Sequence, residues 1–146
     1  MTTCTPKNGS GLKVLTITVE NLAPPMGTVV TPLWFGFHDG SFTIYRDGAP
    51  ASAALERLAE DANAGPISNR FNQAGVGISQ GIVFGSYDIL NSIFPGSTAS
   101  AKVLLDCSLT SSHYFSYAAM IVPSNDALIG KASCIGMRGI KRAEPS

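Results

Sequence analysis

The chain has 146 residues, of which 45% are apolar and 14% are charged, and ten Lys and Arg residues balance ten Asp and Glu residues. This composition excludes a largely disordered chain, and the lack of excess positive charge argues against a nucleic-acid-binding protein. The length is that of one domain, and 15 Gly and 9 Pro residues among β-branched stretches predict a β-rich one.

Two stretches in the first third of the chain predict strands. They follow residues 1–11, whose polar and glycine-rich composition predicts a flexible leader. Apolar and polar residues alternate from Lys13 to Glu20, as in a strand with one buried face. Residues 33–37, Leu-Trp-Phe-Gly-Phe, predict a strand that is buried on both faces.

A helix is predicted from Ser52 to Asp61, the one stretch with clear helical spacing. Ser52 can cap its N-terminus through the side-chain oxygen. The apolar residues on one face of this helix are Ala51, Leu55, Leu58 and Ala59. Residues 66–73 are predicted to add one further turn or a short helix.

The second half of the chain predicts more strands and then a tail. Residues 75–94 are glycine-rich and predict a loop with one or two short strands. Residues 101–105 and 114–122 predict strands, the second buried on both faces as in a sandwich interior. We therefore expect an antiparallel β-sandwich with one short helical insertion over residues 12–130. Residues 131–146 carry four basic residues and one acidic residue and predict a basic, poorly ordered tail.

The cysteines and the chain ends carry limited information about location. No apolar run is long enough for a transmembrane helix, and no signal peptide is visible at the start. Cys4, Cys107 and Cys134 form no C-x-x-C pair, and we expect them to be buried as small hydrophobic side chains. A single disulfide such as Cys107–Cys134 is the alternative.

One catalytic motif occurs in the sequence. Residues 77–81 match G-x-S-x-G around Ser79, and Asp106 and His113 follow in the order found in α/β-hydrolases. The motif requires a buried strand before the serine and a helix after it, and the flanking residues fit neither. We therefore expect a glycine-rich loop and no enzyme. His38, at a predicted strand end, is expected to be a structural histidine hydrogen-bonded near the Asp39-Gly40 turn.

Four segments, in order, resemble the spondin N-terminal domain family, and the chain is most similar to its bacterial stand-alone members. The third contains a Leu-Ala-Glu-Asp helix, and the fourth a Pro-Ser-x-Asp block. These segments are Thr16–Leu22, Thr31–Phe42, Gly48–Asp61 and Met120–Gly130. The resemblance implies a β-sandwich, an extracellular or cell-envelope location, and a role in binding or adhesion.

The resemblance also implies a calcium ion, with Asp126 as one ligand. The family's downstream acidic ligand segment is absent here, since Glu144 is the last acid, and Ala127 stands where the family has an aromatic residue. Calcium takes six to eight oxygen ligands, so the implied site is weak. Asp39, Asp47 and Asp88 are further acids in loops, which the sequence does not place near Asp126.

The expected function is thus a non-enzymatic, spondin-type binding or adhesion module located outside the cell or in its envelope. Its expected partner is a protein or a matrix or envelope component, and not nucleic acid. Two alternatives remain. The first is a truncated structural domain without metal or partner binding, and the second, weaker one is a small serine hydrolase that uses Ser79.

Overall fold

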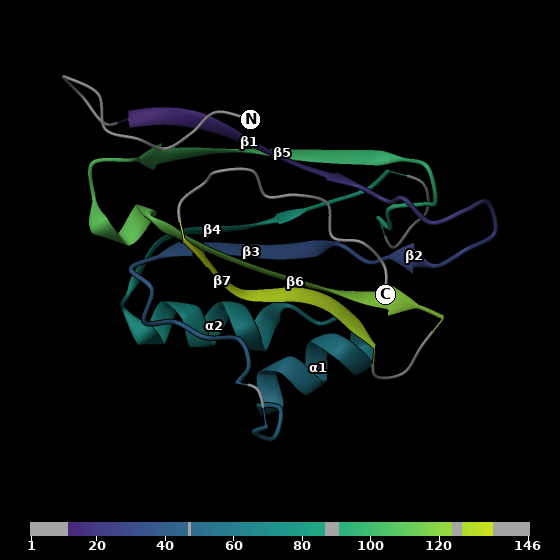
Figure 1. Cartoon of the computed structure of the whole chain (residues 1–146), viewed down its shortest axis with the longest axis horizontal. Coiled ribbons are helices and arrows are strands. Elements are labelled where there is room, and N and C mark those ends of the chain that lie inside the picture. The colour runs from purple at the N-terminus through teal and green to yellow at the C-terminus, as the bar shows by residue number, and fades with distance from the viewer. Residues whose placement is uncertain (1–11, 47, 87–90, 124–126, 136–146) are drawn as a thin grey trace.

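The structure, a computed structural model, describes residues 12–46, 48–86, 91–123 and 127–135. These residues form a mainly β protein with two antiparallel sheets and two α-helices. Figure 1 shows three layers: a small sheet, a larger sheet beneath it, and the two helices on the other face of the larger sheet. The expected antiparallel sandwich with a helical insertion is confirmed.

The small sheet consists of two long strands, β1 (Leu12–Glu20) and β5 (Thr98–Asp106). They pair along their full length, from Leu12 opposite Asp106 to Glu20 opposite Thr98. Leu15 and Ile17 are buried while the residues beside them are more exposed, which confirms the alternation seen in the sequence.

The larger sheet is centred on two strands that are buried on both faces. Their bounds are β3, Leu33–His38, and β6, Tyr114–Val122. They pair antiparallel, with Trp34 opposite Ala118. The outer strands are β2 (Val29–Val30) and β7 (Leu128–Ile135), which pair with β6, and β4 (Gly77–Val83), which pairs with β3.

The helical layer consists of α1 (Ala53–Asp61) and α2 (Gly65–Ala74). The Ser52 hydroxyl accepts a hydrogen bond from the Leu55 N–H at 3.2 Å, so the expected cap is confirmed. The insertion therefore holds two helices. The Gly65-Pro66 pair begins the second one, because a proline in the first turn removes no helical hydrogen bond. A one-turn 3₁₀ helix, Thr110–Ser112, precedes β6.

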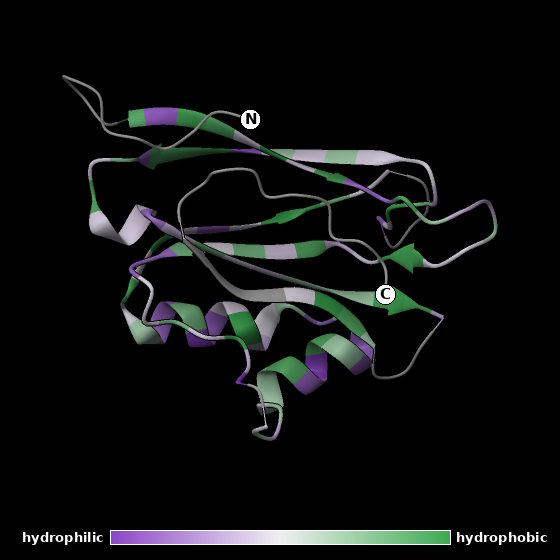
Figure 2. Ribbon diagram, viewed as in Figure 1, coloured by the Kyte–Doolittle hydropathy of each residue, from purple (hydrophilic) through white to green (hydrophobic). Residues whose placement is uncertain are grey.

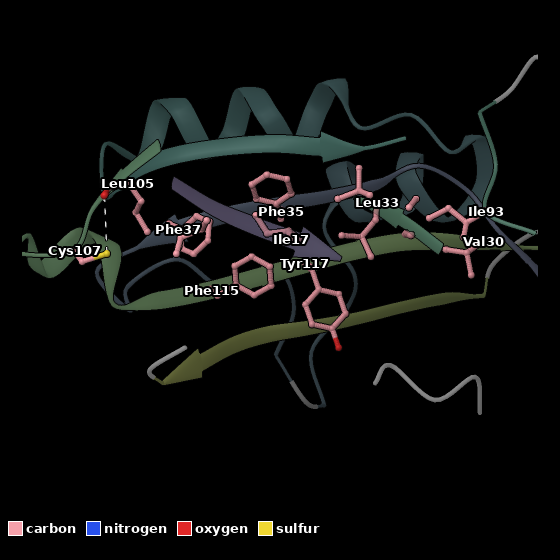
Figure 3. Packing of buried hydrophobic residues seen from close by; sticks show 14 residues of the cluster. Ile17, Val30, Leu33, Phe35, Phe37, Ile93, Leu105, Cys107, Phe115 and Tyr117 are labelled. Carbon is pink, nitrogen blue, oxygen red and sulfur yellow. Dashed lines mark hydrogen bonds between the residues drawn. The ribbon is translucent and has the colours of Figure 1, made fainter. Parts of the chain in front are cut away.

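Two hydrophobic cores hold the layers together. The core between the sheets combines residues of β1 and β5 with aromatic residues of β3 and β6 (Figure 3). The core under the larger sheet joins it to the helices. Its residues include Trp34, Phe42, Ile44, Leu55, Leu58, Ile67 and Phe71.

Two sequence expectations for strands need correction. Residues 77–81, expected as a glycine-rich loop within a segment of one or two short strands, belong to a seven-residue strand, Gly77–Val83, that pairs with β3. Strand β7 runs to Ile135, so the domain boundary expected at residue 130 falls inside a strand, because pairing with β6 extends the strand without a sequence alternation. The predicted leader, 1–11, and residues 136–146 of the predicted tail lie outside the described residues.

Candidate functional site

Ser79 does not occupy a nucleophile elbow. It lies inside β4, opposite Phe37 of β3, whereas the motif needs the serine at a sharp turn from a strand into a helix. The chain around it continues as a strand to Val83. The G-x-S-x-G match is therefore a strand segment with two glycines.

The two residues expected as partners of Ser79 have other contacts. His113 Nε2 lies 3.3 Å from the Cys107 carbonyl oxygen, which can only accept a hydrogen bond, so Nε2 carries the proton there. Asp106 Oδ1 accepts hydrogen bonds from the Ser108 N–H at 3.0 Å and the Ser108 hydroxyl at 2.6 Å. Both side chains thus stabilise the turn between β5 and β6.

Ser79→Ala should leave any hydrolysis of an activated ester, such as p-nitrophenyl acetate, at the level of the unaltered protein. A serine inside a paired strand lacks the sharp strand-to-helix turn that positions a nucleophile for attack. The measurement is the initial rate at several protein concentrations. Turnover that rises with protein and disappears in Ser79→Ala would contradict the expectation that the chain is no esterase.

His38, the last residue of β3, is fully buried under three aromatic rings. Its Nδ1 accepts a hydrogen bond from the Gly40 N–H at 3.0 Å, so the proton sits on Nε2, which donates to the Ser116 hydroxyl at 2.7 Å. The rings of Phe42, Phe71 and Tyr114 surround the imidazole. The expected structural role near the Asp39-Gly40 turn is confirmed.

Burial lowers the pKa of His38, and the neighbouring Asp39 carboxylate raises it by a smaller amount. Hydrogen bonds from Ser41 lower the pKa of Asp39, which therefore stays charged at neutral pH. The charged imidazolium is disfavoured in the folded state because the Gly40 N–H needs an acceptor at Nδ1. The imidazole is thus neutral at pH 7.

Acid should destabilise the fold through His38. Because its folded pKa lies below the unfolded value of about 6.5, the unfolded chain binds a proton first as the pH falls. His38 therefore costs no free energy of unfolding above about pH 6.5. Below that pH the free energy of unfolding falls by up to about 1.4 kcal/mol per pH unit because of this one group. Urea unfolding at pH 7.0, 6.0 and 5.0 measures the loss.

The variant that isolates this effect is His38→Gln. Glutamine at position 38 keeps an acceptor and a donor but does not titrate, so the slope between pH 7 and pH 5 should flatten. A slope that survives in His38→Gln would assign the acid sensitivity to another group.

Cys107 corrects the preferred expectation for the cysteines. It is fully buried at the end of β5, but it is disulfide-bonded rather than a free thiol. Its sulfur lies 3.9 Å from the Leu105 carbonyl oxygen (Figure 3), a contact without proton donation, since a disulfide sulfur carries no hydrogen. The alternative noted from the sequence, a single disulfide that includes Cys107, therefore holds for this residue.

The expected calcium ligand, Asp126, lies outside the described residues, as do Asp47 and Asp88. Within the described part of the chain, no three His, Cys, Asp or Glu side chains gather as a metal site. Asp39 follows the end of β3, where His38 lies opposite Tyr114, the first residue of β6.

A shallow pocket of about 160 Å³ lies between α2 and β4. Its main polar side chain, Gln80, is already engaged: Oε1 accepts from the Trp34 indole N–H at 2.8 Å, and Nε2 donates to the Ser68 carbonyl and to Asn72 Oδ1. These bonds attach α2 to the sheet. Gln80 and Asn72 thus have a structural role, and Ser79 also lines the pocket.

Three large exposed apolar side chains lie at the same end of the larger sheet, which we call the apolar end: Met26, Phe84 and Val122. Val122 ends β6 opposite Val29, Phe84 follows the last residue of β4, and Met26 lies in the loop before β2. Since β4 and β6 both run antiparallel to β3, they end on the same side. Figure 1 shows this side at the right.

Met26 is the most unusual residue of the apolar end. Its side chain is fully exposed and its backbone φ is +65°. The Gly27 N–H donates to the Pro24 carbonyl at 2.8 Å, so Met26 is the third residue of a tight turn, where glycine or asparagine adopts positive φ more easily. Neither the turn nor the core explains an exposed methionine here.

The sequence gives no sign of these exposed residues. A pattern of alternation shows which strand face is buried, but a single apolar residue in a loop gives no signal of this kind.

No protein-family model and no curated protein matches the chain. Within the described residues, no helix has the length and hydrophobicity that crossing a membrane requires.

Proposed function

We propose that the chain is a non-enzymatic, spondin-type binding module that acts outside the cell or in its envelope. The observation that carries the binding role is the apolar end, where Met26, Phe84 and Val122 are exposed on loops and strand ends at the same end of the larger sheet. Loops at the end of a β-sandwich are common binding sites because the sheets hold them in place. The partner is a protein or a matrix or envelope component.

Two further observations support this proposal. The disulfide at Cys107 fits an oxidising compartment, since reducing agents keep most cytosolic thiols reduced. The segments that resemble the spondin family coincide with elements of the fold: Thr31–Phe42 covers β3, Gly48–Asp61 covers the capped helix α1, and Met120–Gly130 joins β6 to β7.

The binding role is tested by co-sedimentation of the labelled chain with an insoluble matrix or envelope preparation from the organism that makes it. We expect saturable binding that falls at least tenfold in a Met26→Asn, Phe84→Ser double variant. Asparagine suits the positive φ at position 26, so this change removes the side chain without straining the turn.

The matched control is Leu109→Ser, which removes an exposed apolar side chain at the other end of β6, just before the 3₁₀ helix. It should bind as the unaltered chain does. Non-saturable binding, or equal loss in both variants, would overturn the proposed site. Absence of any binding would favour the alternative of a structural domain without a partner.

The proposal includes a weakly bound calcium ion, with Asp126 as one of its ligands. The described residues offer no group of three acids, so the ion would depend on Asp126 and on oxygens near it in the chain. A site with few carboxylates binds calcium in the range of about 10⁻⁴–10⁻³ M at best.

Calcium at about 1 mM should therefore stabilise the fold by at most about 1.4 kcal/mol, as follows from ligand linkage at a dissociation constant of about 10⁻⁴ M. A thermal melt with calcium and with chelator measures the shift, and Asp126→Asn should abolish it. A large shift that Asp126→Asn leaves unchanged would place the ion elsewhere. No shift in either protein would make Asp126 a turn residue only.

A further inference from the structure

The outward face of the small sheet carries apolar side chains where a solvent-facing strand pair should carry polar ones. Val14 and Leu104 are direct cross-strand partners and are 60% and 63% exposed. Leu12, the next outward residue of β1, is 57% exposed. Figure 2 shows this hydrophobic end of β1 and β5 at the upper left of the molecule. We call Leu12, Val14 and Leu104 the sheet patch.

The fold itself does not need the sheet patch. The inward residues Leu15 and Leu105 are 1% exposed and already attach this end of the small sheet to the core. Towards the other end, the same outward face is polar, and the Thr18 and Ser100 hydroxyls hydrogen-bond across the strands at 3.1 Å. The apolar character is thus confined to one part of the face, which is typical of an interaction surface.

The charges beside the sheet patch are placed symmetrically on β5. Lys102 is the outward residue two positions before Leu104, and Asp106 is the outward residue two positions after it. Within the described residues, neither forms an ion pair. Asp106 accepts its hydrogen bonds from Ser108 through Oδ1 alone, which leaves Oδ2 for a cation.

We propose that the chain forms a two-fold symmetric dimer through this face. A two-fold axis that crosses the strands at the Val14–Leu104 pair places Leu104 on Leu104 and Val14 on Val14. The same rotation reverses β5 against its copy, so Lys102 of each chain faces Asp106 of the other. This rotation therefore buries the apolar residues and forms two ion pairs between Lys102 and Asp106, as a self-complementary interface requires.

The strength of the dimer follows from its size. Three rows of outward residues, from Leu12 and Asp106 to Thr16 and Lys102, contribute to each side. Stable interfaces use about 20–30 residues a side, so this one belongs to the weak class. We expect a dissociation constant of about 10⁻⁵–10⁻⁴ M, larger at high salt because two ion pairs contribute.

The test is sedimentation equilibrium of the full chain from about 1 µM to about 1 mM, a range that spans the expected dissociation constant, with thermal melts of each variant to verify folding. The unaltered chain should pass from monomer to dimer, and Leu104→Asp should weaken the dimer at least tenfold. Lys102→Asp and Asp106→Lys should each weaken it as well, because each sets like charges against each other twice. Asp106→Asn, which keeps an acceptor for Ser108, controls for loss of the local turn and should have a smaller effect.

The decisive experiment mixes the Lys102→Asp variant with the Asp106→Lys variant. In the mixed dimer, the carboxylate introduced at position 102 of one chain faces the ammonium introduced at position 106 of the other. The second pair joins the unaltered Asp106 of the first chain to the unaltered Lys102 of the second. A heterodimer with both ion pairs should therefore form at concentrations where each variant alone is monomeric.

Two results would overturn the proposal: a chain that stays monomeric over the whole concentration range, or a mixture of the charge variants that does not associate. The Met26→Asn, Phe84→Ser variant should still dimerise, because its changes lie at the apolar end and not on the small sheet. Failure of the proposed binding function and failure of the dimer are therefore distinguishable.

Discussion

Replacing Leu58 with alanine should lower the free energy of unfolding by about 2–5 kcal/mol, the cost of removing a buried leucine from a core that cannot close around the gap. Leu58 is fully buried on α1, in the core beneath the larger sheet with Trp34 and Ile67. Both helices depend on this core, because their outer faces are solvent-exposed. Urea unfolding of the two proteins measures the difference.

Leu109→Ala is the matched control, since the side chain of Leu109 is 42% exposed. It should change the free energy of unfolding by less than about 0.5 kcal/mol. If Leu58→Ala also lowers the free energy of unfolding by less than about 0.5 kcal/mol, α1 is not packed against the sheet. A loss in the expected range would support the position of the helical layer.

The elements that could be predicted from the sequence are those whose pattern of apolar and polar residues matches the burial of their faces. Strand β1 alternates because one of its faces is buried, and α1 shows one apolar face behind a capping Ser52. Strand β6 can be recognised as buried on both faces because it is an almost unbroken apolar run. In each case local pattern and tertiary packing agree.

Strand β4 could not be predicted in this way because its glycines have no side chain to reveal a pattern. The reason for them lies on neighbouring elements. A Cβ on Gly81 would meet the Phe35 ring at 2.8 Å, and a Cβ on Gly77 would meet the Phe71 ring at 2.0 Å. Glycines that receive aromatic rings look like loop residues until the partner rings are known.

The candidate site was predictable to a smaller extent. The position of His38 beside the Asp39-Gly40 turn is enough to indicate a structural role, and its hydrogen bond to Gly40 confirms this. The apolar end could not be predicted, because loop residues show no periodicity. The sheet patch does leave a signal in the sequence: residues 103–105 are consecutive apolar residues, although only one face of β5 is covered by the core.

Gly77→Ala should lower the free energy of unfolding by about 1–3 kcal/mol, the usual cost of overfilling a well-packed core. Two glycines on adjacent strands, Gly36 and Gly77, form the slot that receives Phe71 of α2, and a Cβ on either would lie within 2.7 Å of its ring. The ring cannot move freely, because Trp34 and Phe42 pack against it at centroid distances of 5.5 and 5.1 Å. Phe71→Ala should cost more, about 3–5 kcal/mol, because it empties the slot.

A double variant tests whether Gly77→Ala is costly because its Cβ meets the Phe71 ring or because position 77 tolerates no side chain at all. Leucine at position 71 is shorter than phenylalanine, so the Gly77→Ala, Phe71→Leu double variant should lose about 1 kcal/mol less than the sum of its single changes. Gly96→Ala is the control: Gly96 has φ +80° and no neighbour within 4 Å of its Cβ position, so its cost is conformational and should add to that of Phe71→Leu. Additive costs at Gly77 as well would show that Phe71 does not occupy the space above that glycine. A favourable coupling would identify the ring and the two glycines as the contact that fixes α2 on the sheet.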